Sequence, residues 1–158
     1  MFRDIRKKKN KMSAELTNKL LKETRIGILA VNGDEGYPYA LPINFLYDEA
    51  RQKIFFHGAK RGHKYDALKR SEKVCFSVYG QEMVKEEAWA PFVQSAVIFG
   101  RCHLMENTEQ ALEVLKQFAL KYYPNEKMVM DEIDASRNAV QLFEIDIEQL
   151  SGKEVQEK

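Results

Sequence analysis

The stretch IGILAVNGDEGYPYALPINFLY, residues 26–47, contains the clearest hairpin in the chain. Residues 26–31 form a nearly continuous apolar run, and residues 32–36 (Asn-Gly-Asp-Glu-Gly) form a cluster of turn-forming residues. From residue 39 large apolar residues alternate with others, which predicts a second strand. One face of that strand would carry Tyr39, Leu41, Ile43, Phe45 and Tyr47.

Pro42 lies inside this second strand, and Asn44 falls on the same face as Pro42. A proline has no amide hydrogen to donate to a neighbouring strand, so it is confined to sheet edges and bulges. The strand is therefore expected to lie at an edge, or to bulge, at Pro42.

The rest of the chain continues with short elements. Strands are predicted at 54–57, 74–79, 95–104 and 140–147, and Gly100 interrupts the third of these. Helices are predicted at 14–23, at about 63–71, and from Asn107 or Thr108 to Pro124, with one or two helical turns within 125–137. Six strands that do not alternate regularly with helices predict a mainly β fold, an antiparallel barrel with two or three helices.

The chain length and the position of its basic residues indicate one domain with a basic N-terminal arm. The 158 residues suit one domain, residues 13–158, preceded by a basic arm, residues 1–12. The arm is expected to be solvated, or alternatively to pack on a partner subunit or approach an anionic ligand.

The net charge of +1 gives no field that would draw the whole protein to nucleic acid or to a membrane. Cys75 and Cys102 lie in apolar stretches without ligand spacing, and no signal peptide is evident, so the cytoplasm is the expected compartment.

The segment Phe-His-Gly-Ala-Lys-Arg-Gly-His-Lys, residues 56–64, is the strongest candidate for a binding site. A strand ends at His57 and a helix begins near His63. Gly58 and Gly62 let the backbone approach a ligand, and the free amides of a helix start favour an anion. With Lys60, Arg61, His63 and Lys64 nearby, the segment indicates a phosphate site. A solvated basic turn is the alternative.

The three histidines do not indicate a metal site. His57 and His63 are close in sequence and His103 is separate, but no third ligand follows at a suitable spacing. We therefore predict no bound metal.

Segments in the right order along most of the chain resemble the pyridoxamine 5'-phosphate oxidase-related flavoproteins, and most of all their nitroimidazole-resistance branch. The matching segments are Gly36-Tyr37-Pro38-Tyr39, Leu41-Pro42-Ile43-Asn44-Phe45, Phe56-His57-Gly58-Ala59-Lys60, Gly62-His63-Lys64, residues 95–101, Phe143-Glu144-Ile145 and Ser151-Gly152-Lys153.

This resemblance implies a six-stranded split β-barrel that forms a homodimer, with FMN in two clefts between the subunits. It assigns the phosphate and ribityl chain to His57, Gly58, Ala59, Lys60, Gly62, His63 and Lys64. It places Pro42, Ile43 and Asn44 along the flavin ring and Ser95 in the completed cleft, with Lys153 as a weaker assignment. His57 is a candidate donor to substrate or flavin.

The function that follows is an FMN-dependent oxidoreductase that passes electrons from a reductant such as NAD(P)H to a small nitro compound or quinone. The chain has Leu150-Ser151-Gly152-Lys153-Glu154 where the true oxidase has an Arg-Leu-x-Pro ending, so oxidation of a vitamin B6 phosphate is not expected. The alternatives are a non-enzymatic flavin- or haem-binding module of the same fold and, third, a nucleic-acid binder that uses the basic arm.

Overall fold

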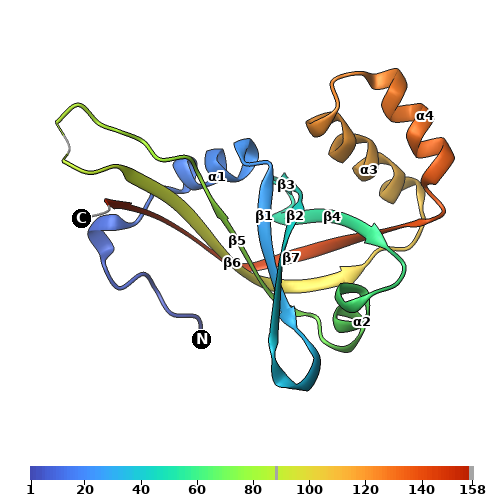
Figure 1. Ribbon diagram of the computed structural model, residues 1–158, viewed down its shortest axis with the longest axis horizontal. Helices are drawn as coiled ribbons and strands as arrows, with labels where there is room; N and C mark the ends of the chain where they lie inside the picture. The colour runs from blue at the N-terminus through green and yellow to red at the C-terminus, as the bar shows by residue number, and fades with distance from the viewer. Residues whose placement is uncertain (88, 157–158) are drawn as a thin grey trace.

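The computed structural model describes residues 1–87 and 89–156 (Figure 1). Its elements in chain order are α1 (Ala14–Glu23), β1 (Ile26–Asn32), β2 (Pro38–Asn44), β3 (Leu46–Asp48), β4 (Lys53–Ala59), α2 (His63–Arg70), β5 (Lys73–Tyr79), β6 (Phe92–Leu104), α3 (Glu109–Tyr122), α4 (Glu126–Ser136) and β7 (Val140–Gln156). Short 3-10 turns span Lys8–Asn10 and Asp34–Gly36.

All the strands belong to one antiparallel sheet in the order β2-β1-β5-β6-β7-β4-β3. The long antiparallel pair of β6 and β7 forms its centre, with α1 and the N-terminal arm toward one end and α2 toward the other (Figure 1). The predicted mainly β, antiparallel fold is confirmed.

The predicted number of six strands is wrong, because the expected strand from Tyr39 to Tyr47 is two strands. β2 ends at Asn44 and pairs only with β1, whereas β3 begins at Leu46 and pairs with β4 at the other end of the sheet order. Phe45 alone joins these two edges, so the sheet must curl to bring them together. The expected edge position of Pro42 is confirmed.

Phe45 is the corner of this curled sheet. Its side chain is fully buried, and its backbone lies outside the strand ladders. Its amide donates to the Tyr122 hydroxyl at 2.8 Å, and its carbonyl accepts from that hydroxyl at 2.7 Å and from the Lys121 amine at 2.9 Å. The Lys121 amine also donates to the Thr24 carbonyl at 2.7 Å. The end of α3 therefore satisfies the backbone groups that the corner exposes.

The number of helices is also higher than the two or three predicted, since the described residues contain four α-helices. Residues 125–137, expected to add a turn or two, contain α4. The Asn125 side chain caps α4 by accepting from the Met128 amide, and Val129 and Ile133 are buried. Side-chain capping and a buried face are sufficient to complete a helix of this length.

The last strand extends well beyond the predicted end at Ile147, reaching Gln156. Phe99 pairs with Gln149 and Gly100 with Ile147, so Glu148 forms a bulge opposite the predicted interruption at Gly100. The polar residues that follow conceal the extension from pattern analysis. The N-terminal arm joins this end of the sheet, since the Met12 amide donates to the Gly152 carbonyl at 2.9 Å.

Gly152 permits the close packing of α1 on β7. A Cβ atom added to Gly152 would lie 2.0 Å from Oγ1 of the buried Thr17. Gly152→Ala is therefore expected to lower the free energy of unfolding by about 1–3 kcal/mol, the usual cost of overpacking. Urea denaturation measures this change. Gly36→Asn is the control, because no atom lies within 4 Å of a Cβ there and asparagine tolerates its positive φ; equal losses in the two variants would contradict the packing argument.

Lys121 should make stability depend on pH. Burial, and then the charge of Arg25, lowers the Lys121 pKa to about 8 from a model-peptide value near 10.5. Between these two values the unfolded chain binds more protons than the folded chain, so this group makes folding more favourable as pH rises. A neutral amine still carries two hydrogens for the Thr24 and Phe45 carbonyls.

Lys121→Met should remove this pH dependence. We expect the stability difference between wild type and variant to grow in favour of wild type from pH 7.5 to about 9.5, below most tyrosine titration. Denaturant melts at several pH values measure it. A difference that stays constant with pH would show that the Lys121 pKa is not depressed.

Candidate functional site

The candidate phosphate segment begins on β4, where neighbouring side chains alternate between the two faces of the sheet. Phe56 belongs to the main core inside the curled sheet, and Phe55 packs on the outside against Ala111 and Val114 of α3. By the same alternation Gly58 faces inward and His57 faces α3. The segment is therefore divided between two environments.

Lys64 extends its side chain to the inner face. Its amine lies 5.5 Å from the ring centroid of Phe56 and 5.9 Å from that of Phe143. A Cβ atom on Gly58 would lie 2.8 Å from the amine nitrogen, so the absence of a side chain at Gly58 leaves room for it. Glycine at 58 and lysine at 64 together place a cation against the inner surface of β4.

Apart from these two rings the cation has no partner among the described residues, since Lys64 makes neither a hydrogen bond nor an ion pair with them. Burial lowers the pKa of Lys64, as expected for a charge that has lost water without gaining an anion. The nearby Cys102 is also buried, and this raises its pKa to about 12, so the thiol stays neutral and cannot balance the charge. An anionic ligand would restore the lost interactions.

Gly62 sets the start of α2. Its φ of 102° and ψ of 171° lie in a region that glycine alone adopts readily, and no side chain caps the helix. The first amides of a helix have no partner within it, so the amides of His63 and Lys64 remain donors. Lys60 and Arg61 are exposed beside this turn. Free amides, local positive charge and the unpartnered Lys64 fit a phosphate group.

His63 belongs to a different contact. Its ring stacks on Tyr39 with centroids 4.1 Å apart, and its Nε2 lies 3.6 Å from an oxygen of Asp34, which also pairs with Arg70. These contacts fasten α2 to the β1–β2 hairpin. The His63 side chain is therefore held by this hairpin, while its amide stays at the helix start.

His57 and Lys60 lie toward α3. The His57 ring meets Phe118 edge-on at 4.9 Å, and Lys60 lines a hollow of about 370 Å³ together with α3 and β7 residues, among them Leu142. Desolvation, and then the charge of Lys64, lowers the pKa of His57 and favours a neutral imidazole, although the side chain is partly exposed to solvent. His57 and His63 are close in sequence, but their rings lie in different contacts, on Phe118 and Tyr39 respectively.

Pro42, Ile43 and Asn44 lie together on edge strand β2. Ile43 is buried in the main core, and the other two side chains are exposed. Asn44 donates to the Arg25 carbonyl at 3.1 Å. An edge strand leaves part of its backbone groups unpaired, and these can bind a planar ligand.

Ser95 is far from the Lys64 amine within the same chain. It pairs with Lys153, nine positions along β6 from the pairing of Leu104 with Phe143, which corresponds to about 30 Å of strand. Ser95 therefore cannot reach this chain's own phosphate segment.

Two aromatic contributors were not identified from the sequence. The Phe143 ring lies 5.9 Å from the Lys64 amine, and the Tyr39 ring stacks on the His63 ring. The alternation within residues 140–147 would have placed Phe143 on the same face as Ile145, but nothing in it indicates which strand pairs with β4.

Two features are absent from the part of the chain that the structure describes. Residues 1–87 and 89–156 contain no group of three or more His, Cys, Asp or Glu positioned to hold a metal ion. Within the same ranges no helix is long and apolar enough to cross a membrane.

Solved structures share the fold. A protein from Bacteroides thetaiotaomicron, provisionally named as a 5-nitroimidazole antibiotic resistance protein, is 18% identical with a TM-score of 0.75, over 90% of this chain and 84% of that one. A FAD-binding protein from Mesorhizobium loti is 21% identical with a TM-score of 0.64, over 92% and 96%. A FAD and heme binding protein from Mycobacterium smegmatis is 19% identical with a TM-score of 0.72, over 92% and 72%.

No curated protein matches the chain. The family described as pyridoxamine 5'-phosphate oxidase matches residues 13–154, which is most of the sequence. The curled antiparallel sheet is accordingly the split barrel of that family. This chain belongs to the pyridoxamine 5'-phosphate oxidase family.

Proposed function

We propose that the chain binds FMN and acts as an oxidoreductase that passes electrons from a reductant such as NAD(P)H to a small nitro compound or quinone. The observation that carries this proposal is Lys64, a half-buried cation without a partner among the described residues, beside Gly58 and the start of α2. A phosphate monoester supplies the missing anion.

In this proposal the chain's own residues bind and orient the cofactor. Lys64 and the amides at the start of α2 hold the phosphate, and the exposed edge of β2 from Pro42 to Asn44 lies along the ring. The bound flavin would supply reversible electron transfer, and the protein sets its position and hydrogen bonding. No side chain acts as a nucleophile.

FMN is favoured over FAD because the sequence contains no Rossmann-like site for an adenosine half. Three of the structural neighbours are named as FAD-binding, so both flavins should be compared. Visible absorbance of the purified protein, and quenching of flavin fluorescence on titration with FMN and FAD, measure binding. A colourless protein that quenches neither flavin would refute the proposal.

Lys64→Ala should weaken FMN binding by about 10- to 100-fold, because a charge-assisted bond to the phosphate is lost. Lys69→Ala is the matched control, since it removes the same charge from the exposed side of the same helix. His63→Ala should instead lower stability through the lost Tyr39 contact and change FMN affinity little. Fluorescence titration and thermal melts separate these effects; equal affinity in wild type and Lys64→Ala would place the phosphate elsewhere.

A homodimer is part of the same proposal. Ser95 is about 30 Å along β6 from the phosphate segment of its own chain, so it can complete only the cleft of a second copy. Tyr79, its partner in the neighbouring strand, is 69% exposed and so is available for contact with a second copy. We place this end of the sheet in the subunit interface.

Tyr79→Arg should therefore weaken dimerisation by about tenfold or more, since a buried tyrosine is a frequent interface anchor. FMN affinity should fall with it. Sedimentation equilibrium and fluorescence titration measure the two effects. Tyr123→Arg, at a tyrosine that is 63% exposed at the end of α3, is the control. A Tyr79→Arg variant that stays dimeric would exclude this interface.

Turnover distinguishes an enzyme from a flavin- or haem-binding module of the same fold. Steady oxidation of NADH or NADPH with a nitro or quinone acceptor supports the oxidoreductase. Tight flavin binding without turnover supports the module.

A further inference from the structure

The hollow of about 370 Å³ beside Lys60 is formed by the first half of α3, the end of β6 and the start of β7, and it lies within the usual size range of small-molecule sites. Figure 1 shows α3 and α4 together, with α4 leading back to the start of β7. Apolar side chains from the three lining elements contribute to its wall: Leu104, Leu112, Leu115, Val140 and Leu142. We call it the α3 hollow.

The α3 hollow adjoins the candidate cofactor segment. Its lining residues 140–142 pair in the β4–β7 ladder with Ala59, Gly58 and His57, and Lys60 lines the hollow itself. Paired residues of neighbouring antiparallel strands have Cα atoms about 5 Å apart. The hollow is therefore part of the same site as the phosphate segment.

The α3 helix leads from the hollow toward the place proposed for the flavin ring. Leu115 lines the hollow, and one turn later Phe118 meets the His57 ring at 4.9 Å. At the end of the helix the Tyr122 hydroxyl bonds to Phe45, which directly follows β2. The step from Leu115 to Tyr122 corresponds to about 10 Å of helix. The hollow, His57 and the end of β2 thus follow one another along α3.

The charges of the α3 hollow favour a ligand with one negative charge. Lys60 and Arg137 are its cations and Glu106 is its acid, which leaves one net positive charge. Lys60 and Glu106 are exposed, whereas Arg137 is half-buried. A second negative charge on the ligand would meet Glu106 without a further cation to balance it.

Arg137, the residue that follows α4, is free to bind such a ligand. In the described part of the chain the arginine side chains in ion pairs are those of Arg51, Arg70 and Arg101. The Arg137 guanidinium also donates no hydrogen bond to a described residue. A guanidinium binds a planar carboxylate through two parallel hydrogen bonds, so Arg137 favours a carboxylate.

Hydrogen bonds fix the walls of the hollow. Gln141, which is 9% exposed, donates from its side-chain amide to the carbonyls of Met105 at 2.9 Å and Leu142 at 2.8 Å. The Met105 amide donates to the Leu142 carbonyl at 2.9 Å. The Asn107 side chain, before α3, donates to that of Asn138, before β7, at 3.4 Å. The hollow is therefore shaped before a ligand enters.

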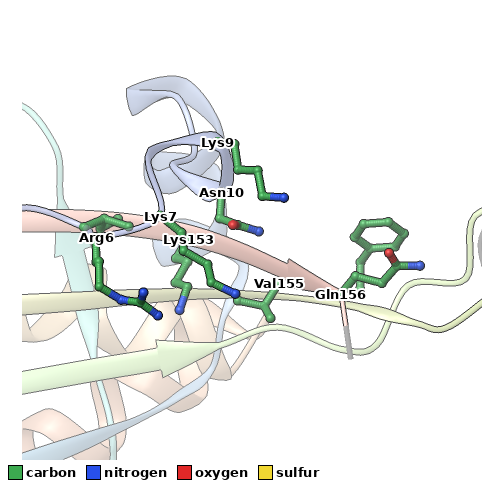
Figure 2. A pocket seen from close by; sticks show the side chains of 9 residues that line it. Arg6, Lys7, Lys9, Asn10, Lys153, Val155 and Gln156 are labelled. Carbon is green, nitrogen blue, oxygen red and sulfur yellow. The ribbon is translucent and has the colours of Figure 1, made fainter. Parts of the chain in front are cut away.

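A larger hollow with more cations lies between the N-terminal arm and β7, where Figure 2 shows Arg6, Lys7 and Lys153. Because Lys153 pairs with Ser95, that hollow belongs to the end of the sheet placed in the subunit interface. The α3 hollow is formed by one chain alone, so its ligand is selected by the residues of one subunit.

We propose, resting on the function proposed above, that the α3 hollow binds the electron acceptor, and that this acceptor is a small aromatic compound with one carboxylate. The aromatic ring lies against the leucines of the wall, the carboxylate binds Arg137, and the reducible group points along α3 toward His57. Arg137 is then a specificity-determining residue, which selects acceptors that carry a carboxylate and takes no part in electron transfer.

Steady-state kinetics with two matched acceptors tests this proposal. 4-Nitrobenzoate and 4-nitrobenzyl alcohol share the reducible nitro group, and only the first has a carboxylate. Reduction of nitro to nitroso consumes one NADH or NADPH and one proton and releases one water, so nicotinamide absorbance follows both. Arg137→Gln should raise KM for 4-nitrobenzoate about tenfold with little change in kcat, because it removes a contact made equally in the bound state and in the transition state. KM for 4-nitrobenzyl alcohol should stay unchanged.

Two further variants complete the kinetic test. Lys127→Gln is the control, since it removes one positive charge from an exposed position of α4. Arg137→Lys should recover part of the affinity, because an ammonium keeps the charge but not the paired hydrogen bonds. An unchanged KM in Arg137→Gln, equal increases for the two acceptors, or the same increase in Lys127→Gln would overturn the proposal.

Calorimetric titration of the full-length protein with 4-nitrobenzoate separates this proposal from the proposed function. If neither nitro compounds nor quinones are turned over, the oxidoreductase is refuted, and binding that is lost in Arg137→Gln still supports the carboxylate site. Undetectable binding, or equal binding by wild type and Arg137→Gln, would overturn the site whatever the turnover.

Discussion

The curled shape of the sheet depends on one residue that belongs to neither neighbouring strand. Phe45 separates β2 from β3, and these strands lie at opposite ends of the sheet order. A flat sheet would hold its two edges several strands apart, so a connection of one residue is possible only when the sheet closes on itself. Buried backbone groups at such a corner need partners, and the Lys121 and Tyr122 side chains provide them. The α3 helix is therefore part of the barrel's closure.

Closure also determines where the phosphate segment lies. Once β3 is held beside β2, β4 follows as its neighbour, and its inner face carries Phe56 and Gly58 into the interior. The α2 helix then returns from β4 toward the β1–β2 hairpin, where His63 meets Tyr39. Lys64, one residue later, is directed at the inner surface of β4. The cation is thus placed by topology, and Gly58 supplies only the space for it.

The sequence predicts where strands and helices lie better than it predicts which strands pair with each other. The hairpin around residues 32–36 and the glycines at 58 and 62 have local signals, and the structure has the expected turn and helix start there. The break at Phe45 has none, because the inward alternation continues unbroken through Ile43, Phe45 and Tyr47 while the pairing partner changes. Periodicity reports which face is buried and carries no information about which strand lies alongside.

The sequence pattern also does not show that the candidate site residues lie on two different faces of β4. His57 and Lys64 are seven positions apart, and both could bind an anion. Because side chains alternate along β4, His57 contacts Phe118 of α3, whereas Lys64, at the start of α2, lies over Phe56 on the inner face. A near-neutral chain can nevertheless have local fields, because part of its acids are engaged in ion pairs away from the candidate site. On the sheet surface Glu144 and Asp146 pair with Lys53, and Glu72 and Glu148 pair with Arg101. Lys64 differs from these surface pairs because it is half-buried and has no acid beside it among the described residues, which suits local anion recognition and not attraction over the whole surface.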